Sequence, residues 1–275
     1  LHKEAPTMIS IESPVVRSGH VLEEPVSSSR LNCFHSCRLK FFFRYVEGLR
    51  KPASVALHVG SCVHRALQEW SRRRWLGRPC ESEDLREDFE EAWMSEQLNN
   101  PVSFECEDEP TQRDKAWGLV EMYLAQTPIP VNEKPEAVEV PVEVDLTQHG
   151  LTTLRGFIDL IRPEGRIVDF KTTASSPDPQ QAYHRNLLQL TIYGVLYEEA
   201  TGMKARGFEL HHLVKTKVPK LVVTEHPATR EPEKTRLFRS IESYLAGVER
   251  EDWVASPGLQ CASCEYFQLC PGGLP

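Results

Sequence analysis

Cysteines at the two ends of the chain restrict the fold more than any other feature of the sequence. Cys261, Cys264 and Cys270 form a Cys-x2-Cys-x5-Cys pattern near the end and supply three soft ligands in one short segment. A tetrahedral sulfur site, whether for Zn²⁺ or for a [4Fe–4S] cluster, needs a fourth thiolate. Cys37 can supply it, and Cys33, one helical turn earlier, is the competitor. The pattern therefore predicts a clamp that joins both ends and closes most of the chain into one loop.

The composition favours an intracellular globular protein. The 275 residues are 40% apolar and 26% charged, as in an ordinary soluble domain. No apolar run approaches the ~18 residues that a membrane span needs, and residues 1–30 lack the compact apolar block of a signal peptide. Eight cysteines without a secretory signal indicate metal or cluster ligation in a reducing compartment rather than disulfides. We therefore expect a cytoplasmic protein with no membrane partner.

The distribution of charge is more informative than its total. A net charge of −8 argues against a general nucleic-acid binder, because contacts with phosphates need Lys and Arg. Residues 30–51 and 65–78 are nevertheless basic, whereas residues 81–109 are strongly acidic. A local basic surface can bind DNA on an acidic protein. We expect the basic stretches to face a bound DNA strand and the acidic stretch to face away from it. In the second basic stretch, we expect Arg72, Arg73 and Arg74 to make the DNA contacts.

The order of the expected elements predicts an α/β fold with a central mixed sheet flanked by helices and a helical N-terminal half. Apolar residues recur at helical spacing in the first half and with a period of two from residue 136 onward. The predicted helices span residues 29–46, 56–76, 82–98, 112–126, 178–200 and 230–249. The predicted strands span residues 137–146, 151–161, 166–171, 208–214 and 220–224. We expect an extended arm at 1–28 and one domain at 29–275, with a helical insertion at about 80–130.

Two aspartates and a lysine in consecutive strands indicate a divalent-metal site. Asp159 lies in the second predicted strand, whereas Asp169 and Lys171 are two residues apart in the third, where their side chains share one face. If these strands form a hairpin, the two carboxylates approach each other and repel unless a cation lies between them. Oxygen ligands of this kind select hard ions such as Mg²⁺ or Mn²⁺. A lysine on the same face can orient water or stabilise charge on a transition state at phosphorus.

The chain resembles the PD-(D/E)XK nuclease superfamily, in its RecB-like branch. The resemblance extends over residues 27–271 and rests on short motifs that stand in the expected order. It departs from the family at Arg38, where a proline usually follows the amino-terminal cysteine. The motifs are an amino-terminal helix with Cys37, Gly60-x-x-x-His64, Gly156-Phe-Ile-Asp159, Asp169-Phe-Lys171-Thr172 and Gln189-x-x-x-Tyr193.

The resemblance implies a restriction-endonuclease-like core and assigns roles by position. Lys171 would be the catalytic lysine, next to a site for Mg²⁺ or Mn²⁺. The metal ligands would be His64, Asp159, Asp169 and the backbone carbonyl of Phe170, and the residues that steady the site or contact DNA would be Gln189 and Tyr193. Iron–sulfur members of the family place one cysteine on the first helix and three after the last. That arrangement favours a [4Fe–4S] cluster over Zn²⁺, held by Cys37, Cys261, Cys264 and Cys270.

These inferences predict a metal-dependent DNA nuclease, an exonuclease that acts on single-stranded ends in DNA repair, recombination or CRISPR-type DNA processing. The sequence contains no Gly-x4-Gly-Lys-[Ser/Thr] phosphate loop and so has no evident ATP motor of its own. A helicase or another nucleic-acid-processing protein is therefore an expected partner. The first alternative is a non-catalytic DNA-binding or scaffold module of the same fold in a helicase–nuclease complex. The second alternative is a zinc-stabilised enzyme of another class that acts on acidic small molecules.

Overall fold

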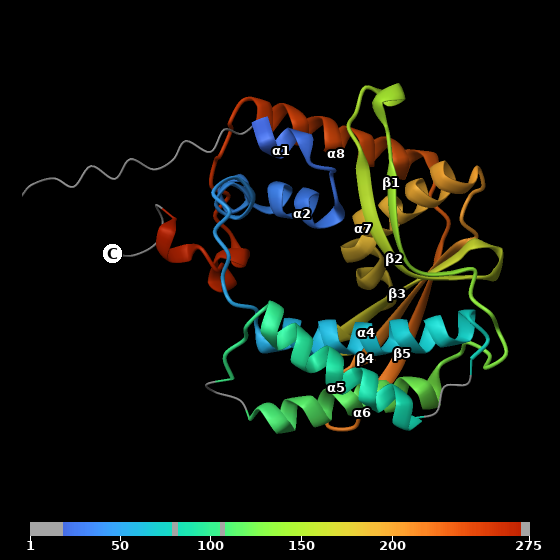
Figure 1. The fold of residues 1–275 in the computed structure, drawn as a ribbon. Coiled ribbons are helices and arrows are strands. Elements are labelled where there is room, and N and C mark those ends of the chain that lie inside the picture. Colours follow the sequence, from blue (N-terminus) through green and yellow to red (C-terminus); the bar gives the residue numbers. More distant parts are fainter. Residues whose placement is uncertain (1–18, 79–81, 105–107, 271–275) are drawn as a thin grey trace, which may run out of the picture.

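A computed structural model of the protein describes residues 19–78, 82–104 and 108–270 (Figure 1). Five strands form one sheet in the order β1-β2-β3-β4-β5. Neighbouring strands run antiparallel except β3 and β4, which are parallel. The predicted α/β class with a mixed sheet is therefore confirmed. The strands are β1 Ala137–Val144, β2 Leu154–Arg162, β3 Arg166–Thr173, β4 Gly207–Val214 and β5 Lys220–Pro227.

The parallel strands β3 and β4 are buried and are joined by a helical crossover. Every residue of β4 is buried, as is the middle of β3. Parallel strands of this kind need cover on both faces and a long connection. Helix α7, Pro179–Thr201, is that connection. The side chain of Asp178 caps its start by accepting a hydrogen bond from the N–H of Gln181, and Gly202 ends it with a left-handed φ of 72°.

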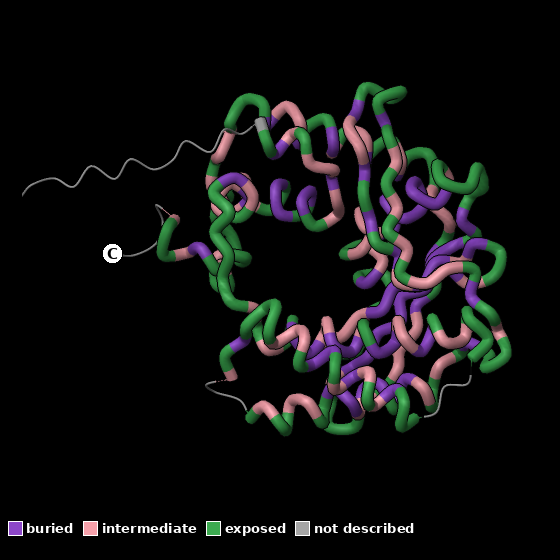
Figure 2. Tube along the Cα trace, viewed as in Figure 1, coloured by how far each residue is buried: buried purple, intermediate pink, exposed green. Residues whose placement is uncertain are grey.

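Helices cover both faces of the sheet, so that two apolar cores lie on its opposite sides (Figures 1 and 2). One core joins the sheet to α4 Val55–Trp75, α5 Ser82–Asn99 and α6 Glu109–Gln126. The other core joins the sheet to α2 Ser28–Ser36, α7 and α8 Glu231–Glu249. Helices α5 and α6 fall in the predicted helical insertion, yet they share a core with Leu160, Val168 and Phe170 of the sheet. This part of the chain is therefore integral to the fold.

The N-terminal region differs from the prediction in two places. A helix, α1 Gly19–Glu23, occupies part of the predicted extended arm, and residues 1–18 of that arm lie outside the described residues. The predicted helix at 29–46 is interrupted at Cys37, whose backbone is extended, with φ of −166° and ψ of 114°. The chain then continues as α3 Arg38–Phe41 and a π-helical turn, η1 Phe42–Val46.

The segment after α8 returns to this N-terminal region, as the cysteine pattern predicts. The N–H of Leu39 donates to the carbonyl of Val254, and the N–H of Ser256 donates to Sγ of Cys37 at 3.5 Å. Two short 3-10 turns follow, η4 Leu259–Ser263 and η5 Phe267–Leu269. Figure 1 shows this segment beside the turns that follow α2. Among the described helices, none is both long enough and apolar enough to cross a membrane.

Candidate active site

The site forms where β2 and β3 separate. Their ladder ends at the pair Leu160–Val168, so the next residues of β3 have no partner strand on that side. Asp159 fills this place, because its Oδ2 accepts a hydrogen bond of 2.9 Å from the backbone N–H of Phe170. The N–H and C=O of one strand residue point to the same edge of the strand. The carbonyl of Phe170 is therefore directed to the side on which Asp159 lies.

A local reversal of the strand faces occurs at Asp159. Ile158 packs in the core with α7 and Leu160 in the core with α4, although residues two apart normally share a face. On β1 the residue opposite Asp159 is Glu139, which has a left-handed φ of 42° and lies between two regular pairs of the ladder. Such distortions re-aim side chains and occur often beside active sites. The reversal turns Asp159 toward His64 of α4.

The geometry adds Glu139 to the residues expected at the site. Burial raises the pKa of its carboxyl, and the charge of Asp159 raises it further, while Arg65 and His64 lower it. Glu139 therefore lies within electrostatic range of the predicted metal ligands. Its sequence context, a glutamate between two valines in an alternating strand, is that of any solvent-facing strand residue. No signal in the sequence separates it from Glu143.

Asp169 and Lys171 lie on the face of β3 that α7 covers, as their two-residue spacing predicts. Lys171 Nζ is 2.7 Å from Asp169 Oδ2 and donates to Gln189 Oε1 at 2.8 Å. Gln189 Nε2 donates to Asp169 Oδ1 at 3.0 Å and to the hydroxyl of Tyr193 at 2.7 Å. The Tyr193 hydroxyl is 3.3 Å from Asp169 Oδ1. Gln189 and Tyr193, one turn apart on α7, thus hold Asp169 and Lys171 in place. Gly156 of β2 allows α7 to pack this closely, because a Cβ there would meet Leu196 and Tyr193.

The carboxylate of Asp169 is held in an unfavourable environment for its charge. The residue is only 2% exposed, and burial raises the pKa of its carboxyl; the charge of Asp159 also raises it, and the two effects outweigh the lowering by Lys171. Apart from the ion pair with Lys171, its buried Oδ2 has no hydrogen-bond partner. A buried carboxylate oxygen without a full set of partners is what a further cation would satisfy.

His64 of α4 approaches the carboxylate of Asp159. Its Nδ1 lies 3.6 Å from Oδ2 of Asp159, and its side chain is 35% exposed. Burial lowers the pKa of the imidazole, but the Asp159 carboxylate outweighs this effect, so that the pKa is raised overall. Helix α4 can lie this close because Gly60 faces β3, where a Cβ would be 3.1 Å from Oγ1 of Thr172. The Gly-x-x-x-His spacing thus has a packing reason.

The predicted metal donors are of the right chemical type for a divalent ion, although they do not surround a single point. Two carboxylates, an imidazole and a free strand carbonyl form the kind of donor set that Mg²⁺ or Mn²⁺ accepts. Within the described residues, no three His, Cys, Asp or Glu side chains are grouped closely enough to hold a metal ion by themselves. The ammonium of Lys171 lies against Asp169 instead. The buried, incompletely bonded Asp169 Oδ2 is the observation that fits a divalent ion.

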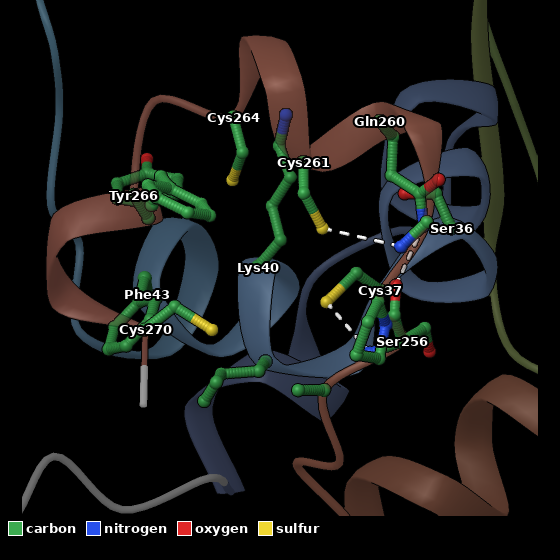
Figure 3. A pocket seen from close by; sticks show the side chains of 15 residues that line it. Ser36, Cys37, Lys40, Phe43, Ser256, Gln260, Cys261, Cys264, Tyr266 and Cys270 are labelled. Carbon is green, nitrogen blue, oxygen red and sulfur yellow. Dashed lines mark hydrogen bonds between the residues drawn. The ribbon is translucent and has the colours of Figure 1, made fainter. Parts of the chain in front are cut away.

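The four predicted cluster cysteines line one cavity of about 250 Å³ between the N-terminal turns and the C-terminal segment (Figure 3). Figure 3 shows the sulfur atoms of Cys37, Cys261, Cys264 and Cys270 around this space. Cys33 does not line the cavity: it is 8% exposed and belongs to the apolar core with α2, and burial raises the pKa of its thiol to about 11. The geometry thus separates two cysteines that the sequence leaves in competition.

The predicted DNA-contacting arginines have other roles in the structure. Arg73 pairs with Glu69 of its own helix and with Asp84 and Asp88 of α5. The guanidinium of Arg74 lies 4.4 Å from the ring of Trp70 and donates to backbone carbonyls of the loop before β1, including that of Glu133 at 2.7 Å. Arg72 has an exposed side chain and pairs with Glu69. Within the protein, the neighbouring acidic helix and the loop thus already supply partners to Arg73 and Arg74, and the DNA contacts expected of all three arginines stay a prediction.

Comparison with known proteins identifies the family. The family model of the PD-(D/E)XK nuclease superfamily matches residues 25–271. No curated protein matches the sequence. Among solved structures, a candidate exonuclease from Eubacterium rectale is similar, with 15% identity, a TM-score of 0.58 and coverage of 90% of this chain and 86% of that one. The structure of SSO0001 has 14% identity, a TM-score of 0.38 and coverage of 90% and 96%. This chain belongs to the PD-(D/E)XK nuclease superfamily.

Proposed function

We propose that this nuclease is a metal-dependent deoxyribonuclease that acts as an exonuclease on single-stranded ends. One observation carries the proposal: the buried Asp169 carboxylate is bound by Lys171, Gln189 and Tyr193 on one side of β3, while Asp159 and His64 meet on the other. A structural ion pair would not need this many polar groups from separate elements. Clusters of perturbed titratable groups of this kind are typical of active sites.

Each side chain has a defined task in phosphodiester hydrolysis. When bound by His64, Asp159, Asp169 and the Phe170 carbonyl, Mg²⁺ or Mn²⁺ would activate water and neutralise phosphate charge. Gln189 and Tyr193 hold the Asp169 carboxylate in one orientation, so that it need not reorganise during the reaction. Lys171 can move from its ion pair with Asp169 to the scissile phosphate, where its charge stabilises the transition state.

We also propose a [4Fe–4S] cluster in the cysteine cavity. The proposal is supported by four thiols from both ends of the chain that border one space. The preference for a cluster over a single zinc ion comes from the resemblance to iron–sulfur members of the family, which have this one-plus-three arrangement; among the described residues no three cysteines are grouped closely enough to hold one metal ion. A cluster offers a separate iron atom to each thiolate. Its function would be structural, since it would join Cys37 to the end of the chain.

The biological setting that we propose is DNA repair, recombination or CRISPR-type processing, with a helicase or similar protein as a partner. The alternative of a non-catalytic scaffold of the same fold would predict decay of the site. The acidic, basic and amide residues of the resemblance are instead all present: Asp169, Lys171 and Gln189 contact one another, and Asp159 lies 3.6 Å from His64. This argues for an active enzyme over a scaffold.

The proposal is tested with linear and circular single-stranded DNA of one sequence, each incubated with Mn²⁺ or with EDTA. An exonuclease digests the linear form and spares the circle, because a circle offers no end. Cleavage of both forms would show an endonuclease instead of an exonuclease. Cleavage of RNA of the same sequence, with DNA left intact, would show that DNA is not the substrate. Digestion that persists in EDTA would contradict metal dependence. The Lys171→Ala protein controls for contaminating nuclease.

A further inference from the structure

One face of the β1–β2 hairpin is left uncovered beside the carboxylates. Residues Leu154, Gly156 and Ile158 of β2 face the core with α7. Because strand residues alternate, Arg155 and Phe157 project from the opposite face, and both are exposed. Helix α4 packs on the other half of β2, where Leu160 enters its core. The hairpin surface that continues from the site toward the tip of β1 and β2 is therefore open.

Phe157 is the unusual residue on this open surface. Its neighbours there are Arg155 and Glu143, which pair with each other, and Pro141, which lies directly opposite Phe157 in the ladder. The Phe157 residue is 54% exposed. A single exposed apolar side chain needs no explanation in general. This aromatic ring, however, is two residues from Asp159, or about 7 Å along the strand, and it follows the glycine that packs against Tyr193.

Helix α4 carries a second exposed apolar side chain on the face that bears His64. Leu57 is 60% exposed and stands seven residues before His64, which places both on the same face of the helix, two turns apart. Exposed apolar groups thus occur on β2 and on α4, the two elements that supply predicted metal ligands on this side of the sheet. Neither belongs to an apolar core cluster of the described residues. A nucleotide next to a phosphate bound at Asp159 would come within reach of Phe157, which is about 7 Å away along the strand.

We propose that the ring of Phe157 stacks on an unpaired base adjacent to the scissile phosphate, with Leu57 as a second apolar contact. The inference rests on the proposed nuclease function and names its substrate as a strand with unpaired bases. Inside a duplex each base is paired and stacked on both faces, and at a duplex end pairing still holds the terminal base in the stack, so the ring could insert beside the scissile phosphate only in an opened strand. Stacking on an aromatic side chain accepts every base, which suits a nuclease that digests regardless of sequence. Phe157 would therefore select unpaired strands while it orients the phosphate toward Asp159.

The test combines a change in the protein with a change in the substrate. Short single-stranded oligonucleotides carry one abasic nucleotide at successive positions around a cleavage point, and kcat/KM is measured with Mn²⁺. Wild-type protein should lose roughly 5- to 150-fold on the oligonucleotide that lacks the stacked base. Phe157→Ala should lose a similar factor on the intact strand and show no further loss on the abasic one. Phe157→Trp should restore both the rate and the sensitivity to the missing base.

A matched variant and a binding measurement keep the outcomes separate. Met203 is 60% exposed in the loop between α7 and β4, and Met203→Ala should change neither rate nor abasic sensitivity. Quenching of 2-aminopurine at the stacked position, recorded in EDTA, reports stacking without cleavage and should vanish in Phe157→Ala. If Phe157→Ala keeps the wild-type abasic sensitivity and the quenching, the proposal is overturned. If no protein cleaves but the quenching depends on Phe157, the nuclease function fails while the stacking contact stands.

Discussion

The carboxylate of Asp159 accepts the hydrogen bond that a neighbouring strand would otherwise take from the backbone N–H of Phe170, at 2.9 Å. The contact gives Asp159 two functions. It satisfies a strand donor at the point where the β2–β3 ladder ends, and it holds one carboxylate oxygen beside the edge to which the Phe170 carbonyl points. The separation of the two strands is therefore part of the site, because a longer ladder would occupy both backbone groups.

The buried charge of Asp169 predicts that this residue lowers the free energy of unfolding of the metal-free protein at neutral pH. Its folded-state pKa is raised above the ordinary value of 3.8, so the stability contribution of the protonated form is lost as the pH rises through the folded-state pKa. Asp169→Asn should therefore raise Tm at pH 7 by roughly 2–8 °C. The gain should shrink as the pH falls and vanish below about 3.8, where Asp169 becomes protonated in the unfolded state as well as in the folded state. A lower Tm for the variant at pH 7 would show that the ion pair with Lys171 outweighs burial.

The same residue predicts the response of stability to metal ions. If Asp169 is a ligand, Mn²⁺ at a hundred times its dissociation constant should stabilise the wild-type fold by about 2.7 kcal/mol. The Asp169→Asn protein should show much less of this stabilisation. Thermal unfolding with and without Mn²⁺ measures the difference without any cleavage assay. Equal stabilisation of both proteins would place the ion elsewhere in the structure.

The hydrogen bonds of Gln189 predict that it positions Lys171 rather than taking part in the chemistry. Lys171→Ala should lower kcat by roughly 10²–10⁴-fold, since it removes a charge at the phosphate. Gln189→Ala removes a hydrogen bond to Lys171 and one to Asp169, and we expect a loss of about tenfold. Gln181 provides a matched control, because it is exposed on the same helix two turns earlier. Gln181→Ala should keep the wild-type rate; equal losses at both glutamines would refute the positioning role.

The cysteine cavity predicts which of two neighbouring thiols is a cluster ligand. Cys37 borders the cavity, whereas Cys33 is buried in the apolar core. Protein purified without oxygen should be brown, with an absorbance band near ~400 nm. Cys37→Ala should lose the band and the iron, and Cys33→Ala should keep both. Stoichiometric zinc without iron in the wild-type protein would contradict the cluster, and loss of iron from Cys33→Ala alone would reverse the assignment.

The contacts of the basic stretch on α4 predict a structural role for Arg73. Arg73→Ala removes ion pairs with Asp84 and Asp88 that join α4 to α5, and it should lower the free energy of unfolding by about 1 kcal/mol. Arg72→Ala, at an exposed neighbour, should change it by less than about 0.5 kcal/mol. Denaturant titration measures both. The salt dependence of DNA binding should be the same in Arg73→Ala and in wild-type protein; a shallower slope would mean that Arg73 contacts phosphate.

Local patterns in the sequence predict most of the fold. The start of α7 is predictable because Asp178 and Pro179 form a cap and a first turn, and its end because Gly202 adopts a left-handed conformation. The pairing of Asp169 with Lys171 follows from a two-residue spacing alone. These features depend on residues close together in the chain, so the sequence displays them directly.

Features that depend on distant contacts were not predictable. The helix at 29–46 breaks at Cys37, where residues from the other end of the chain supply hydrogen bonds to Leu39 and Cys37. The left-handed backbone of Glu139 occurs opposite Asp159, whereas its own sequence context is that of an ordinary strand. The ion pairs of Arg73 with Asp84 and Asp88 of α5 cannot be read from its place in a basic stretch of the sequence. Each case needs the tertiary structure, because no local preference points to it.

The central claim is that Asp169 belongs to the centre that cleaves DNA. The most direct measurement is the digestion of end-labelled single-stranded DNA in Mn²⁺ by wild-type and Asp169→Asn proteins, purified in parallel and shown by thermal unfolding to be folded. We predict that wild-type protein shortens the labelled strand and that EDTA abolishes this activity. The Asp169→Asn protein should bind the same DNA with similar affinity and leave it intact. Cleavage by folded Asp169→Asn protein at the wild-type rate would contradict the account.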